Sequence, residues 1–139
     1  MERPIKPKIV VLGAMNSDFF IKGERFPRPG ETLDGDTFLS AAGGKGANQA
    51  VAAARLGANA SLISCVGPDS RGSEMLAGLK AEGVNTRFVF KASNEPTGAA
   101  LCLVDKRGEK IIFAAPGANH ALKPAHLRKA AMAISSATR

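Results

Sequence analysis

The sequence predicts an α/β protein built on a parallel β-sheet, and three observations support this class. Apolar, β-rich runs at residues 9–13 (IVVLG) and 61–66 (SLISCV) are typical of strands buried on both faces of such a sheet. Each run precedes a segment with helical features, so that strand and helix alternate along the chain. A glycine-rich turn at residues 43–46 opens the first helix, as expected where a strand hands over to a helix.

The first half of the chain divides into elements as follows. After the strand at residues 9–13, we expect short strands at residues 19–21 and 37–39, separated by a loop at residues 25–35 with two prolines and two glycines. The next element is a helix over residues 47–56, whose apolar positions follow the helical period and whose stop signal is Gly57.

The second half begins with the strand at residues 61–66. Asp69 is the expected N-cap of a helix that runs to Glu82 and ends at Gly83, with Met75, Leu76 and Leu79 on its inner face. A further strand is expected at residues 87–91, and a β-hairpin at 98–104 and 109–115 about the turn DKRG. A last helix starts near Pro124. Because no glycine cap and no strand follow it, we expect the chain to be part of a larger domain.

Composition excludes several classes of function. The chain of 139 residues has the length of one domain, and no apolar run approaches the ~20 residues of a membrane span. The N-terminus lacks the apolar segment of a secretory signal, so a cytoplasmic location is expected. The net charge of +7 comes from scattered basic residues without aromatic side chains for base stacking, which argues against nucleic-acid binding.

Cysteine and histidine give no catalytic or metal-binding pattern. Cys65 and Cys102 each lie inside an apolar run, so two buried thiols are expected rather than a disulfide. The spacing of His120 and His126 matches no metal-binding motif, and His126 is expected on a solvated helix face. We therefore assign no catalytic, cofactor-binding or metal-binding residue.

Asn16 and Asp18 form a first candidate site just after the first strand. At positions i and i+2 of an extended segment their side chains share one face. A carboxylate and an amide together suit the neighbouring hydroxyls of a sugar. An Asx turn that leaves the strand explains the same residues equally well.

The second candidate is the glycine-rich turn with Lys45 and Asn48. Glycine lets a ligand approach the backbone, the helix start offers free N–H groups, and Lys45 adds a positive charge. The turn matches neither the P-loop nor the dinucleotide-binding pattern. A purely structural strand-to-helix turn is the alternative.

The longer pattern GGKGANQA at residues 43–50 resembles the N-terminal signature of the ribokinase (PfkB-type) family of carbohydrate kinases. The resemblance extends over the whole chain and includes Gly13 with the N-x-D of residues 16–18. The other matching segments are PGET at residues 29–32, VGPD at 66–69, TG at 97–98 and PGAN at 116–119.

The resemblance implies part of a three-layer α/β/α sandwich with a small β-sheet lid, whose strands lie within residues 19–41 and 98–115. In the family, positions equivalent to Asn16, Asp18, Gly44, Lys45 and Asn48 bind sugar hydroxyls, and those of Ala100 and Ile112 cover the apolar side of the sugar. Simple hairpin packing is the alternative for the last two.

The implied reaction is phosphoryl transfer from ATP to the 5-hydroxyl of D-ribose, with Mg²⁺ and a monovalent cation (K⁺), in a homodimer formed through lid strands. The GxGD motif that carries catalysis in the family does not occur in this sequence, nor does a further sugar-binding glutamate. We therefore expect the sugar-binding half of a kinase, inactive alone. The alternatives are a related sugar or nucleoside kinase, and a non-catalytic form that binds sugar or dimerises.

Overall fold

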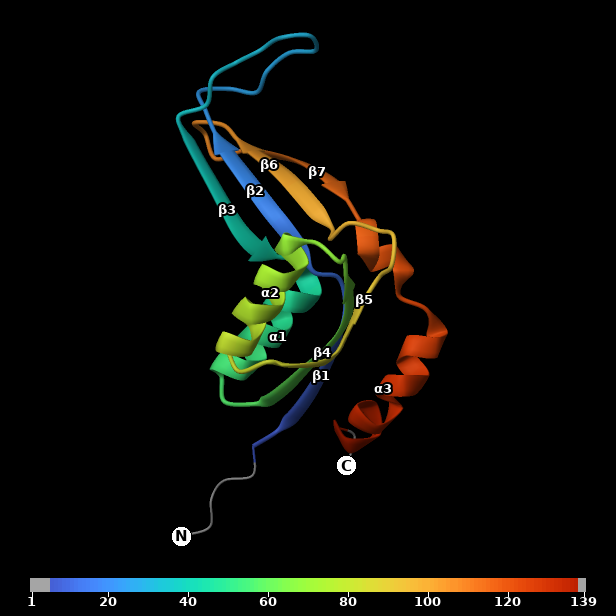
Figure 1. Ribbon diagram of the computed structural model, residues 1–139. Coiled ribbons are helices and arrows are strands. Elements are labelled where there is room, and N and C mark those ends of the chain that lie inside the picture. Colours follow the sequence, from blue (N-terminus) through green and yellow to red (C-terminus); the bar gives the residue numbers. More distant parts are fainter. Residues whose placement is uncertain (1–5, 138–139) are drawn as a thin grey trace.

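The computed structural model describes residues 6–137 and consists of a three-layer α/β/α body with a β-sheet lid above it (Figure 1). The body sheet has the parallel strands β1 (Lys8–Leu12), β4 (Asn59–Val66) and β5 (Asn85–Lys91), in the order β1-β4-β5. Helices α1 (Lys45–Arg55) and α2 (Ser70–Ala81) cover one face, and α3 (Pro124–Ala137) lies on the other. The predicted fold class is confirmed.

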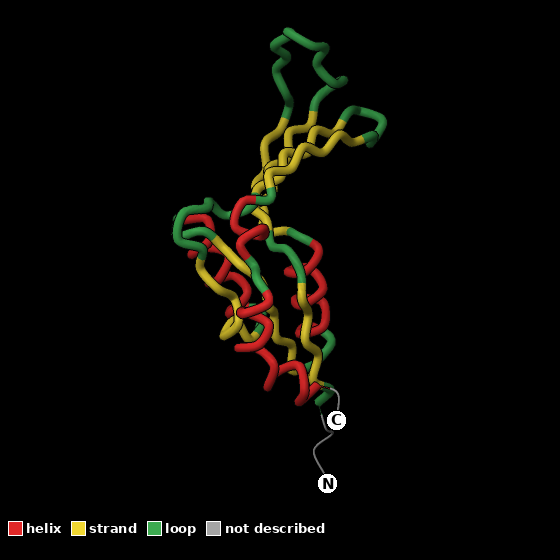
Figure 2. The backbone as a smooth tube through the Cα atoms, turned by 90° about the vertical axis from the view of Figure 1, so that its right-hand side faces the viewer, coloured by secondary structure: helices red, strands yellow, loops and turns green. Residues whose placement is uncertain are grey.

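The lid is a second sheet with four strands in the order β3-β2-β6-β7. Strands β2 (Asn16–Lys22) and β3 (Thr37–Gly43) are antiparallel, β2 runs parallel to β6 (Ala99–Val104), and β6 forms the predicted hairpin with β7 (Lys110–Ala115). Figure 2 shows the lid projecting from one end of the body. Strand β2 begins three residues before the predicted strand at 19–21, and β3 ends four residues after the predicted strand at 37–39, because these two ends pair with each other.

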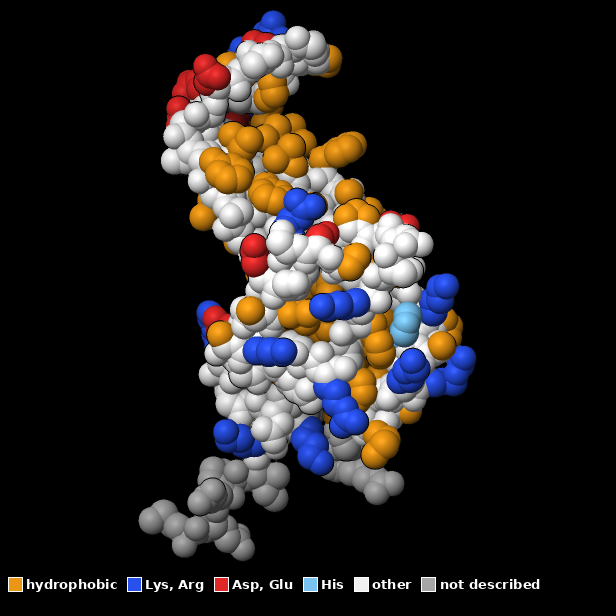
Figure 3. Space-filling model, viewed as in Figure 1, with side chains coloured by type: hydrophobic (Ala, Val, Ile, Leu, Met, Phe, Trp, Pro, Cys, Tyr) orange, Lys and Arg blue, Asp and Glu red, His pale blue; other side chains and the backbone are white. Residues whose placement is uncertain are grey.

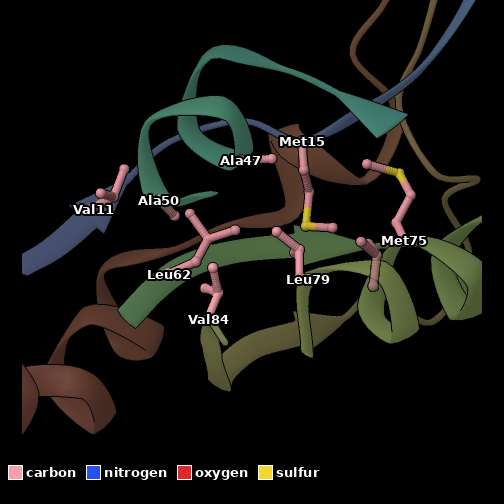
Figure 4. Close-up of a cluster of buried hydrophobic side chains, with 9 residues drawn as sticks. Val11, Met15, Ala47, Ala50, Leu62, Met75, Leu79 and Val84 are labelled. Carbon is pink, nitrogen blue, oxygen red and sulfur yellow. The ribbon is translucent and has the colours of Figure 1, made fainter. Parts of the chain in front are cut away.

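The main core lies between the body sheet and helices α1 and α2 (Figure 4). Helix α1 contributes small side chains, which let it approach the sheet closely, and α2 contributes larger ones. The fully buried members of this core include Met15 and Leu62, which are 0% exposed. The other members are Val11, Ala47, Ala50, Val66, Met75, Leu79 and Val84.

Strand β1 differs from the prediction that it is buried on both faces. Only Val11 is buried, whereas Ile9 is 39% and Leu12 is 56% exposed. The reason is its position at the edge of the described sheet, where β4 is its one partner and α3 covers the second face incompletely. The apolar run therefore indicated a strand correctly, but not how fully it is covered.

The predicted helix signals are confirmed. The Asp69 carboxylate accepts a hydrogen bond from the Gly72 N–H at 2.9 Å and caps α2. Gly57 and Gly83 follow α1 and α2 with φ of 91° and 80°, the left-handed backbone that favours glycine. None of the described helices is long and apolar enough to span a membrane.

A short 3₁₀ helix, η1 (Gly117–Ala121), links the lid to α3 and was not predicted. Next to it, Cys65, Ala92 and Ala118 form a second small core, and both cysteines are free and buried, as expected. His126 is half-buried rather than on a fully solvated helix face as predicted. Its ring stacks on Phe90 with centroids 4.4 Å apart, and its Nδ1 accepts a hydrogen bond from the Lys123 N–H.

Candidate functional site

The candidate site lies where the lid meets the body, at the start of β2. Asn16 and Asp18 are both in β2 and share one face of the lid, with Gly43 opposite Asn16 and Ala100 beside Asp18. The side chain of Asp18 fills the space above Gly43, where a Cβ atom would lie 1.9 Å from Asp18 Oδ2. Only glycine at this position leaves room for the carboxylate.

The Asp18 carboxylate is the unusual group of the site. Its Oδ1 atom is buried, and within residues 6–137 it has no hydrogen-bond partner. Burial raises the pKa of Asp18 above its ordinary value. A buried acceptor without a partner lowers stability unless a ligand or water satisfies it. This pattern favours a ligand with a hydroxyl or amine donor.

Gly44 brings the start of α1 against the same strand. Its φ of 92° requires glycine, and a Cβ atom there would lie 2.6 Å from Met15 Cα and 2.8 Å from the Asn16 nitrogen. The N–H groups of Gly46 and Ala47 both donate to Ala14 O, at 3.0 and 3.3 Å. Two of the free N–H groups expected for a ligand are thus used to fasten α1 to the end of β1.

Lys45 and Asn48 lie on the first turn of α1 and are exposed. No hydrogen bond within the described residues joins either side chain to Asp18, and Asn48 also lines a hollow between α1 and α2. The structure brings these two residues to the same junction as Asn16, Asp18 and Gly44 without fixing their side chains on a common point.

Ala100 and Ile112 lie on the lid face that carries Asp18. Ala100 in β6 pairs with Asp18 in β2 and is 8% exposed. Ile112 in β7, one strand further out, pairs with Cys102 and is 53% exposed. Ala100 therefore forms the floor beside the carboxylate, and Ile112 forms an open apolar edge. The antiparallel register puts the two side chains on the same face, an arrangement that fits both apolar cover for a ligand and simple hairpin packing.

The site is an open face rather than a closed cavity. Two hollows, of about 390 and 290 Å³, lie elsewhere on the α3 side of the body sheet. The first is lined by basic side chains such as Lys8 and Arg87, and the second mainly by apolar ones such as Leu12 and Leu127. The second hollow also contains a buried oxygen without a partner within residues 6–137, the Ser64 hydroxyl. That hydroxyl is uncharged, whereas Asp18 is a carboxylate with neighbouring polar groups, which makes the lid junction the better candidate.

Two polar residues near the site were not among the predicted site residues. Asn119 in η1 donates a hydrogen bond from Nδ2 to Asn16 Oδ1 at 2.9 Å. The Asp69 carboxylate accepts hydrogen bonds from both the N–H and the hydroxyl of Thr97, which lies just before the lid strand β6. The hydroxyl is the main reason that the pKa of Asp69 falls to about 2. Both lie in the motifs PGAN and VGPD, which the sequence showed without indicating their contacts.

Comparison with known sequences gives a consistent result. Residues 6–139 match the model of the pfkB family of carbohydrate kinases. The chain is similar to ribokinase of Haemophilus influenzae, with 44% identity over 131 residues that cover 94% of this chain and 43% of the relative. It is 45% identical over 134 residues to ribokinase of Schizosaccharomyces pombe, which covers 92% of this chain and 42% of that relative. The chain thus spans less than half the length of these curated relatives.

Solved structures resemble the fold over most of the chain. Ribokinase from Giardia lamblia superposes with a TM-score of 0.85 at 34% identity, covering 93% of this chain and 39% of that one. Arabidopsis thaliana ribokinase, solved with ribose and ATP, gives 0.73 at 36% identity over 83% of this chain and 38% of that one. A nucleoside kinase from Methanocaldococcus jannaschii gives 0.71 at 30% identity over 81% and 38%. The chain therefore belongs to the pfkB family of carbohydrate kinases.

Proposed function

We propose that this chain provides the pentose-binding half and the lid of a kinase that transfers the γ-phosphoryl group of ATP to the 5-hydroxyl of D-ribose. The observation that carries the proposal is the buried Asp18 Oδ1 atom without a hydrogen-bond partner, on a lid face beside the start of α1. The similarity to ribokinases, one of them solved with ribose and ATP, supports ribose as the sugar.

In this proposal each residue has a defined task. The Asp18 carboxylate accepts a hydrogen bond from a sugar hydroxyl, and the amide of Asn16 donates to the neighbouring hydroxyl. Gly44 allows the sugar to approach the backbone, while Lys45 and Asn48 close around it from α1. Ala100 and Ile112 provide the apolar cover, and the small side chain of Ala100 leaves room for the ring.

We assign no residue between 6 and 137 to the binding of ATP or of its cations. Between residues 6 and 137 no three His, Cys, Asp or Glu side chains lie close enough together to hold a metal ion. ATP supplies the phosphoryl group, and Mg²⁺ and K⁺ belong to the proposed reaction as the family has it. We therefore propose that the residues described here bind and orient the sugar and exclude water.

Calorimetric titration of the purified chain with D-ribose, D-arabinose and adenosine tests the sugar site. We expect saturable binding of ribose, weaker binding of its 2-epimer arabinose, and little for adenosine. Tighter binding of adenosine would replace ribose by a nucleoside as substrate, and no binding of any of the three would refute the site. ATP-dependent ribose phosphorylation by this chain alone would contradict the assignment of catalysis to other residues.

A homodimer formed through the lid is the second part of the proposal. The lid face opposite Asp18 carries Phe38, Leu101, Ile111 and Phe113, which are 41 to 83% exposed (Figure 3). An exposed apolar sheet face of this kind is typical of a surface that is covered by another copy or a partner. It also supports the alternative of a non-catalytic form that only dimerises.

Light scattering with size-exclusion chromatography tests the dimer. We expect Phe113→Lys to shift the chain toward monomer, because Phe113, on the edge strand β7, is 83% exposed and is the most exposed of these four side chains. The matched control is Leu56→Lys, an 88% exposed leucine at the end of α1 that lies away from the lid. A wild-type chain that stays monomeric at high concentration would refute the dimer.

A further inference from the structure

Asn119 of the PGAN segment makes four hydrogen bonds with one amide group. Its Oδ1 accepts from the Met15 N–H at 3.0 Å. Its NH₂ group has two hydrogens and faces three acceptors, Met15 O at 3.1 Å, Pro116 O at 2.8 Å and Asn16 Oδ1 at 2.9 Å, so that one hydrogen is shared between two of them. Asn119 thereby joins the exit of the lid to the point where β1 passes into β2, more than 100 residues earlier in the chain.

These contacts permit only one orientation of the Asn119 amide. A backbone N–H can only donate and a backbone carbonyl can only accept, so the oxygen of Asn119 must face the Met15 nitrogen and its NH₂ group must face the carbonyls. The same NH₂ group faces Asn16. Asn16 must therefore present its oxygen to Asn119 and its own NH₂ group elsewhere.

The free NH₂ group of Asn16 is the group that a ligand would use. Within residues 6–137 Asn16 Nδ2 has no hydrogen-bond partner, and Asn16 shares its lid face with Asp18, whose Oδ1 atom also has none. The face thus offers a donor and an acceptor two residues apart on one strand. A pair of neighbouring hydroxyls matches this set, because one accepts from Asn16 while the other donates to Asp18.

Gly98 encloses the two amides from above. A Cβ atom at Gly98 would lie 2.3 Å from Asn119 Nδ2 and 2.6 Å from Asn16 Oδ1, and Gly98 O accepts from the Ser17 N–H at 2.8 Å. The backbone before β6 therefore packs directly over the contact between Asn119 and Asn16. A side chain at position 98 would therefore displace one of these two amides.

We propose that Asn119 is a positioning residue of the sugar site, which fixes the Asn16 amide so that its donor faces the ligand beside Asp18. The proposal rests on the proposed function, since the ligand is the pentose of that site. Asn119 itself does not contact the sugar. Without it, the Asn16 amide can turn over and place its oxygen next to the Asp18 carboxylate, where two acceptors face the same hydroxyl pair.

A double-mutant cycle on ribose binding tests this role, with Asn119→Ala, Asn16→Ala and the double variant. We expect Asn119→Ala to weaken ribose affinity about 3- to 10-fold, the loss of roughly one hydrogen bond. In the Asn16→Ala background the same change should have almost no further effect, because the residue it positions is absent. The control is Asn94→Ala, an exposed asparagine in the loop before β6, which should leave the affinity unchanged.

Side-chain amide NMR of the unmodified chain provides a measurement that does not depend on how well the variants fold. We expect slow hydrogen exchange for the NH₂ group of Asn119, fast exchange for that of Asn16, and a shift of the Asn16 signal when ribose is added. A protected Asn16 NH₂ group, or one that ribose does not affect, would overturn the proposal.

The outcomes separate the two proposals. A wild-type chain that binds none of the sugars overturns the proposed function. Wild-type binding with equal losses from Asn119→Ala in both backgrounds overturns the positioning role alone, because Asn119 then acts through the general stability of the junction. Loss confined to the background with Asn16 intact supports it.

Discussion

Replacement of Asp18 by asparagine separates the binding role of this residue from its effect on stability. The carboxylate has a buried oxygen without a partner, and burial raises its pKa. Asparagine has nearly the same shape and no charge, so the cost of burying the carboxylate disappears. We therefore expect Asp18→Asn to leave the melting temperature of the ligand-free chain unchanged or higher at pH 7. Most substitutions of part-buried residues do the opposite.

The effect on ribose binding should be large and opposite in sign. A hydrogen bond to a charged acceptor contributes about 1.5–3 kcal/mol, so its loss weakens affinity about 10- to 150-fold. At a ribose concentration of about 100 times the wild-type Kd, the ligand stabilises the wild-type chain by about 2.7 kcal/mol, or about 10 °C. For Asp18→Asn the shift at that concentration should fall to about 1–5 °C.

Differential scanning calorimetry with and without ribose measures both effects in one experiment, and Asp34→Asn in the exposed loop before β3 is the control. The pH dependence follows from the raised pKa. In the ligand-free chain the contribution of Asp18 to stability is greatest at low pH and is lost as pH rises through its folded pKa. Ribose affinity should fall as pH drops through the same pKa. A lower melting temperature with unchanged ribose binding in Asp18→Asn would refute the assignment.

Three further substitutions test the junction and the loop above it. Gly44→Ala should lower the free energy of unfolding in urea by about 2–5 kcal/mol, because alanine is strained at this positive φ and its Cβ atom would clash with Met15. The control is Gly57→Ala, where φ is similar but the space is open, and the loss should be about 1–2 kcal/mol. Equal losses of stability in the two variants would show that no close approach exists at Gly44. Asp69→Asn should cost about 1–2 kcal/mol at neutral pH through loss of the α2 cap and of the tie to Thr97. Because the pKa of Asp69 falls to about 2, the wild-type advantage should disappear as pH drops from 3.8 toward 2, and an advantage that persists at pH 2 would contradict this reading. Glu31→Gln should speed proteolysis of the loop at residues 25–35 with little change in the melting temperature, since Glu31 accepts from the exposed Arg25; an unchanged cleavage rate would show that this ion pair does not hold the loop.

Local signals in the sequence were sufficient for most of the fold. Asp69, Gly57 and Gly83 act on backbone within a few residues of themselves, and each marks the helix end that it was expected to mark. The start of β2 at Asn16 was not predictable in this way, because it depends on pairing with Gly43, which is 27 residues away. The exposure of Leu12 likewise depends on what covers the sheet, and an apolar run carries no such information.

The candidate site shows the same division between local and distant causes. Asn16 and Asp18 share a face because of the strand period, which the sequence displays directly. That Asp18 lacks a partner, and that Asn119 orients Asn16, follow only from contacts between distant segments. The PGAN motif is one of the segments that match the family, but its position in the sequence does not indicate that its asparagine reaches β2.

The position of the site explains why these polar residues gather there. The chain passes between body and lid four times, at Met15, Gly44, Thr97 and Pro116. Each crossing is tied to another: Asn119 holds Met15, Ala14 O holds α1 after Gly44, and the Ala118 N–H donates to Pro96 O beside Thr97. A ligand held by Asp18 in the lid and by the start of α1 in the body would bridge the same junction. Sugar binding and lid orientation should therefore be coupled, so that a substitution which loosens any crossing weakens ribose affinity even where it leaves Asp18 untouched.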